Sequence, residues 1–126
     1  MKIVTTVARY LLGGGFIVFG LNAFLQFMPP IELPEEGGQF MGLLFGSGYF
    51  NYIATLKIVA GLMLVLGRFV PLALTLLGPI LVNILLFHIS FDPAGIGMGL
   101  VFTILWFAVF WAHRESFKGL FEAKAA

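Results

Sequence analysis

Four long apolar stretches constrain this sequence more than any other feature. They cover residues 3–28, 50–66, 69–91 and 94–112. A helix needs about 20 largely apolar residues to cross the hydrocarbon core of a bilayer, and each stretch reaches or approaches that length. Only 10% of the residues are charged, against about 25% in ordinary soluble domains. The sequence therefore predicts an all-α membrane protein, a four-transmembrane-helix up-and-down bundle, with residues 1–126 forming one domain.

Short segments that contain proline or glycine separate the apolar stretches. Pro29 and Pro30 end the first one, and a tight helical hairpin turn at residues 67–71 divides the second from the third. Gly67 is suited to cap a helix C-terminus there, and Pro71 is suited to a helix start. Asp92 is a candidate N-cap for the fourth helix. The first stretch is too long for the apolar core of a signal peptide and lacks a small-residue cleavage site, so we expect an uncleaved span.

The segment between the first two spans, residues 29–49, has two parts. Its first half is polar and broken by prolines, with three glutamates. Its second half, residues 39–45, is apolar but too short to cross a bilayer. We expect a short interfacial helix in this first outer loop.

Charge placement predicts the orientation of the four spans. Six of the seven basic residues fall on one side of a four-span topology: Lys2, Arg9, Arg68, Arg114, Lys118 and Lys124. The loops on the other side carry Asp92 and the three glutamates, which we expect to be solvated. The positive-inside rule then places both termini in the cytoplasm.

Polar residues inside the spans are the candidate functional residues, because each is costly in lipid unless it is paired or faces a cavity. Their estimated depths fall in the outer half of the bilayer, which suggests an outward-facing polar pocket roofed by the proline-rich loop. Simpler interpretations stay open: Lys57 snorkelling to headgroups, asparagines joining helices and an interfacial histidine. The candidate ligand-binding residues are Asn22, Gln26, Lys57, Asn83 and His88.

Other sequence features argue against autonomous chemistry. The chain has no cysteine, so disulfides, thiol redox chemistry and cysteine-ligated metals are excluded. A lone histidine without a second ligand one turn away does not make a metal site. We assign no catalytic residue, and a net charge of +1 gives no sign of nucleic-acid binding. The glycines at 13–15 and 20 are expected to allow close helix packing.

Several short motifs, in the same order along nearly the whole chain, resemble the DoxX family of small four-helix membrane proteins. They comprise residues 18–24, 40–42 with 46–49, 60–62 with 67–73, and 79–84 with 87–88. The resemblance implies the four-helix fold and the plasma (inner) membrane of a prokaryote. It also implies a role as a component of a membrane oxidoreductase. The chain departs from the family pattern at Lys57, where many members have Glu, and at Gln26, where many have His.

The resemblance leads to an expected function. The protein would be an accessory subunit, or a binder of a lipophilic molecule such as a quinone, linked to a membrane redox partner in the lipid bilayer. Lys57 would favour an anionic or carbonyl-bearing ligand, and Asn22 and Asn83 would bond a ligand oxygen. Two alternatives stay open, a purely structural assembly subunit and a small-solute transporter. A homo-oligomer is also compatible with the sequence.

Overall fold

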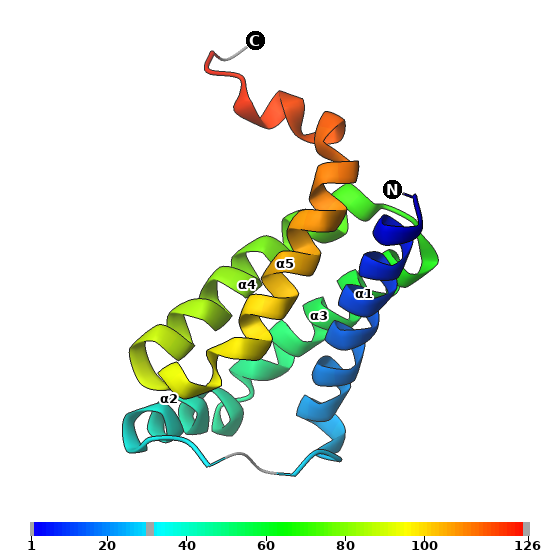
Figure 1. Ribbon diagram of the computed structural model, residues 1–126. Coiled ribbons are helices and arrows are strands. Elements are labelled where there is room, and N and C mark those ends of the chain that lie inside the picture. Colours follow the sequence, from blue (N-terminus) through cyan, green and yellow to red (C-terminus); the bar gives the residue numbers. More distant parts are fainter. Residues whose placement is uncertain (1, 30–31, 125–126) are drawn as a thin grey trace.

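The computed structural model describes residues 2–29 and 32–124, and the described chain is helical, without strands. Within these residues, five α-helices and two 3₁₀ helices follow one another, arranged as Figure 1 shows. Their bounds are α1 Lys2–Leu25, α2 Glu35–Gly46, α3 Tyr49–Leu66, α4 Val70–Phe91, η1 Pro93–Gly95, α5 Ile96–Ala112 and η2 Arg114–Phe121.

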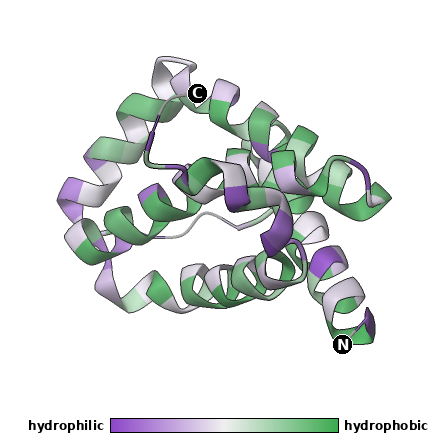
Figure 2. Ribbon diagram, turned by 90° about the horizontal axis from the view of Figure 1, so that it is seen from above, coloured by the Kyte–Doolittle hydropathy of each residue, from purple (hydrophilic) through white to green (hydrophobic). Residues whose placement is uncertain are grey.

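Four segments are long and apolar enough to cross a membrane: α1, α3, α4 and the continuous Pro93–Ala112. This confirms the prediction of a multi-pass helical membrane protein, with bounds close to those expected from the apolar stretches. Hydrophobic residues make up much of each helix (Figure 2), and many large apolar side chains are exposed. Lipid is a suitable environment for such a surface, since soluble monomers rarely expose large contiguous apolar patches.

The spanning helices form an up-and-down bundle in which each packs against two others. Helix α1 lies against α3 and α5, and α4 lies against the same two helices. The start of α1, the α3–α4 turn and η2 gather at one end, called here the termini end (Figure 1). Helix α2, η1 and the end of α1 lie at the opposite end, called here the α2 end. The described basic residues other than Lys57 therefore belong to the termini end.

Helices α1 and α3 approach one another closely through glycine. A Cβ atom built on Gly13 would lie 2.7 Å from the Gly61 carbonyl oxygen, and one on Gly61 would lie 2.6 Å from the Gly13 oxygen. Gly20 and Gly15 are similarly crowded, by Ile58 and by the Phe102 ring. The close-packing prediction holds for these glycines. It is wrong for Gly14, whose Cβ direction is open.

The α3–α4 turn has the predicted glycine cap. Gly67 is left-handed (φ 69°), and its N–H donates to the Leu64 carbonyl (3.2 Å) while the Arg68 N–H donates to Met63 (3.0 Å). A feature that the sequence did not predict reinforces this helix end. The Arg9 guanidinium of α1 donates to the carbonyls of Leu64 and Val65, which places a cation at the negative end of the α3 dipole.

Two boundaries differ from the prediction. Helix α1 ends at Leu25, before Pro29, because Gln26 turns left-handed (φ 50°). The Asn22 side-chain oxygen then accepts the N–H of Met28 (2.8 Å). Asp92 precedes η1 without capping it through its side chain. The loop contains a short helix, α2, whose interfacial location stays a prediction; Pro30 and residue 31 lie outside the described residues.

Candidate functional site

Among the residues that the structure describes, Lys57 is the charged residue that is buried, with 8% of its surface exposed. It shares one face of α3 with buried Ala54, Ala60, Gly61 and Leu64, so it points into the bundle. The side chain leans toward the start of its own helix, as helical side chains do. This brings its ammonium 4.8 Å from the centre of the Phe50 ring, two turns earlier.

The Lys57 ammonium makes no hydrogen bond or ion pair with the residues that the structure describes. Its contact with the Phe50 face contributes about 2 kcal/mol when desolvated. Removing a charge from water costs several kcal/mol, so the ring alone does not compensate the ammonium. The site is thus a donor group with unused hydrogen-bonding capacity at the end of a buried side chain, although its nitrogen is not fully enclosed. Such a group favours an acceptor oxygen or an anion as its partner.

Aromatic rings connect Lys57 to the α2 end of the bundle. The Phe50 ring lies 4.5 Å from the ring of Phe45 in α2, measured between centroids. Phe40, also in α2, lies 5.8 Å from Phe87 and 5.4 Å from Phe91 at the end of α4. Helix α2 therefore covers this end through rings on both α3 and α4. These contacts were not predicted from the sequence, although Phe87 and Phe91 are one turn apart on one helix face.

Asn22 and Gln26 lie at the end of α1. The Asn22 oxygen caps the departing chain through Met28, which leaves its amide nitrogen without a partner among the described residues. Gly20, two residues earlier, packs against Ala54 and Ile58 of α3. Asn22 is therefore near the level that the Lys57 side chain reaches. The Gln26 side chain is exposed.

Asn83 lies on the outside of the bundle. Its side chain is exposed, while Leu77 and Leu81 form the buried face of α4. Its amide nitrogen donates to the Pro79 carbonyl oxygen one turn earlier (2.9 Å). The structure thus separates Asn83 from the interior face that carries Lys57.

His88 forms a pair with Asp92 at the α2 end. Its Nδ1 lies 3.7 Å from the Asp92 carboxylate, and the two side chains are 20% and 16% exposed. Nδ1 is also 3.2 Å from the Asp92 backbone oxygen. Gly95 packs beneath the pair, since a Cβ there would lie 2.6 Å from the Asp92 carboxylate. Asp92 is therefore paired and partly covered, and the i, i+4 spacing of the two residues was the available signal for the pair.

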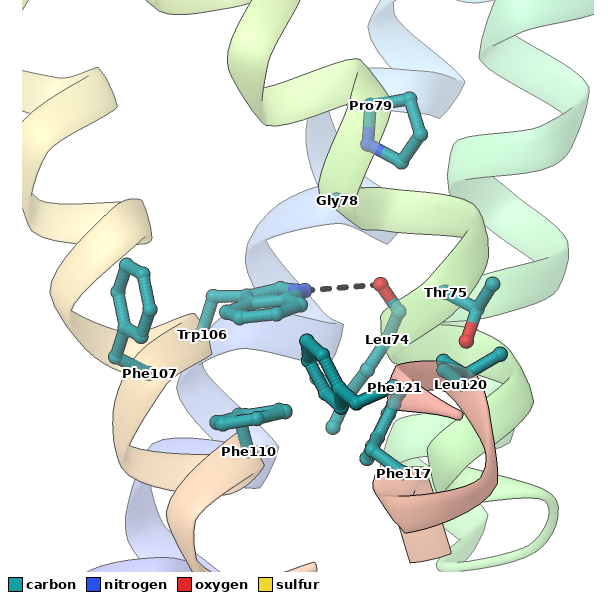
Figure 3. Close-up of a pocket in the computed structure, with 10 residues that line it drawn as sticks. All are labelled: Leu74, Thr75, Gly78, Pro79, Trp106, Phe107, Phe110, Phe117, Leu120 and Phe121. Carbon is teal, nitrogen blue, oxygen red and sulfur yellow. Dashed lines mark hydrogen bonds between the residues drawn. The ribbon is translucent and has the colours of Figure 1, made fainter. Parts of the chain in front are cut away.

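An open cavity lies elsewhere, between α4, α5 and η2. It measures about 410 Å³. Its walls are apolar and aromatic (Figure 3), and it contains none of the five candidate residues. A smaller cavity of about 220 Å³ lies beside the first residues of α1. Within the described residues, no group of three potential metal ligands comes together.

Taken together, four spanning-length apolar helices around an interior lysine define a small multi-pass helical membrane protein. Comparison with known proteins adds one relative of similar length. The chain is 27% identical over 129 aligned residues to the uncharacterized protein YwoB of Bacillus subtilis (strain 168), an alignment that covers 96% of this chain and 84% of that protein. No family model matches the chain. No solved structure matches it either.

Proposed function

We propose that the protein is a DoxX-type integral membrane subunit that binds a lipophilic molecule carrying a carbonyl or anionic oxygen, with a quinone as the leading candidate. It would serve a membrane redox complex as an accessory subunit and would not be an autonomous enzyme. The observation that carries the proposal is the buried side chain of Lys57, whose ammonium has no hydrogen-bond or ion-pair partner among the described residues.

The surroundings of Lys57 suit such a ligand. The ammonium can donate to a ligand oxygen, and the unused amide nitrogen of Asn22 near the same level offers a second donor. The rings of Phe45 and Phe50 provide an apolar aromatic surface beside it. Apolar walls with a few directed polar groups are the usual composition of small-molecule sites. His88, paired with Asp92, could exchange protons at the α2 end.

The proposal includes a location and a partner. The protein would lie in the plasma (inner) membrane of a prokaryote with both termini cytoplasmic, because the basic residues collect at the termini end. The chain has no cysteine, so any electron transfer would be carried by the bound molecule and by a redox partner.

A binding experiment tests the Lys57 site directly. Wild-type protein is purified in mild detergent and titrated with a water-soluble ubiquinone analogue, and bound analogue is measured by equilibrium dialysis. The Lys57→Met variant keeps the side-chain length and removes the donor, so we expect its affinity to fall at least about tenfold, the effect of losing a hydrogen bond to a charged group. The matched control is Lys118→Met, which removes an exposed lysine and should bind normally. Equal affinity of Lys57→Met and wild type would contradict the proposal.

A second candidate, a structural assembly subunit, is favoured by Asn83. Its exposed amide lies on the outside of a spanning helix, where an asparagine can bond to a neighbouring helix. Under this alternative Asn83→Leu would release a partner or a second copy, and Lys57→Met would leave assembly unchanged. Transport is less well supported, since the termini half of the interior is filled by Leu12, Leu64 and Leu74.

A further inference from the structure

Helix η2 has two chemically different sides. Phe117 is buried and its ring lies 5.0 Å from that of Phe110 in α5. Leu120 and Phe121 continue this apolar side but are 70% and 79% exposed. The remaining positions hold Arg114, Glu115, Ser116, Lys118 and Gly119. A short segment of this kind is suited to the boundary between headgroups and acyl chains.

The cavity described above lies between this segment and the bundle. One wall is the stacked pair Trp106 and Phe110, whose rings are 5.2 Å apart and 8° from parallel. The second wall is α4 from Leu74 to Pro79, and the third is the apolar side of η2 (Figure 3). Its volume, about 410 Å³, falls within the range of about 300–1,000 Å³ found for small-ligand sites.

The polar atoms of the side chains that line this cavity are already engaged. The Trp106 indole N–H donates to the Leu74 carbonyl oxygen (3.0 Å). The Thr75 hydroxyl donates to the Pro71 carbonyl oxygen (2.9 Å). A ligand that needs directed hydrogen bonds, such as a quinone ring, would therefore find no free side-chain donor. A saturated hydrocarbon chain needs none.

The charges at this end favour an anionic headgroup above the cavity. Arg114 is exposed at the start of η2, where its guanidinium lies 4.5 Å from the ring of Trp111 and also donates to the Trp111 carbonyl oxygen (2.6 Å). Arg68 is exposed just before α4 and makes no ion pair within the described residues. Lys118 is already paired with Glu115 (2.6 Å). We propose that the cavity holds one acyl chain of an anionic phospholipid, whose phosphate lies near Arg114 and Arg68.

Tryptophan fluorescence can test this site, because the chain has only two tryptophans. The Trp111→Phe variant leaves Trp106, which lines the cavity, as the single reporter. The protein is reconstituted into phosphatidylcholine vesicles that contain increasing amounts of phosphatidylglycerol with brominated acyl chains. The quenching of Trp106 fluorescence by the brominated chains is measured. We expect brominated phosphatidylglycerol to compete about fivefold or more better than brominated phosphatidylcholine, since each basic residue near the surface contributes about that factor. Arg68→Gln with Arg114→Gln should remove the preference.

A glycine pair provides the matched control. A Cβ on Gly78 would meet only the Trp106 ring, at 3.6 Å. We therefore expect the Gly78→Leu side chain to fit without a backbone shift and to point toward the cavity. We expect this variant to lose the phosphatidylglycerol preference. Gly97→Leu, in open space on α5, should keep it. Equal quenching by the two lipids, or an undiminished preference in Gly78→Leu, would overturn the proposal. The site shares no residue with the Lys57 site, so either proposal can fail without the other.

Discussion

At the residue scale, Lys57 is buried without a charged neighbour, and this determines how its replacement should affect stability. The Lys57→Met variant removes a charge carried by a buried side chain without an ion-pair partner in the described residues, and it fills a similar volume. We expect the free energy of unfolding to rise by about 1 kcal/mol or more, measured by denaturant titration in detergent micelles. Lys118→Met serves as the exposed control, with little change. A loss of stability in Lys57→Met would mean that the ammonium has a protein partner.

Gln26 offers a second test at the residue scale. Its left-handed backbone (φ 50°) is costly for most residues, and glycine adopts it without steric penalty. Gln26→Gly should therefore leave the free energy of unfolding unchanged or raise it by up to about 1 kcal/mol. Gln26→Val should lower it, because a β-branched residue tolerates this conformation poorly. Thermal unfolding in detergent distinguishes the two, and equal melting temperatures would argue that α1 ends elsewhere.

At the element scale, the α1–α3 contact depends on two facing glycines. A methyl group at Gly61 would lie 2.6 Å from the backbone oxygen of Gly13, and backbone cannot yield as a flexible side chain can. We expect Gly61→Ala to lower the free energy of unfolding by about 1–3 kcal/mol, the usual cost of overpacking.

Gly14→Ala is the matched control for this contact. Gly14 lies beside Gly13 in α1, but its Cβ direction is open, and alanine is the better helix former. It should be neutral or stabilising in the same unfolding measurement. Similar losses in both variants would show that helix propensity, and not interhelical contact, explains the result.

The existence of the spanning helices was predictable from the sequence, but the residues at which they end were less so. Long apolar stretches made the spanning helices clear, and Gly67 correctly marked the end of α3. The early end of α1 at Leu25 was missed because it depends on the backbone of Gln26 and a side-chain bond from Asn22. The aromatic contacts of α2 and the segment η2 were also missed, since they depend on which helix faces meet in three dimensions.

The candidate site was only partly predictable for the same reason. Depth along a helix can be counted from the sequence, and the grouping of the five polar residues in the outer half of the bilayer stays a prediction. The rotation of each helix about its own axis cannot be read from the sequence. In the structure, this rotation places Lys57 inside the bundle and Asn83 outside it. His88 is paired with Asp92, one turn later.

At the scale of the whole molecule, charge asymmetry predicts the orientation in the membrane. The absence of cysteine gives a clean background for single-cysteine labelling. Ser116→Cys at the termini end should be protected from a membrane-impermeant maleimide in intact spheroplasts and react after lysis. Gly42→Cys in α2 should react in intact cells, because the positive-inside rule places that end outside. The reverse pattern would invert the proposed topology.

The bond from Arg9 to the end of α3 has a consequence for biosynthesis. The ribosome delivers Arg9 long before Leu64 and Val65, whose carbonyls accept the guanidinium in the finished protein. Until α3 has been inserted, α1 lacks both this bond and the glycine-mediated contact with its principal neighbour. A nascent chain arrested before residue 64 would therefore hold its first helix only loosely. Helix α1 would become fixed when the second spanning helix is complete.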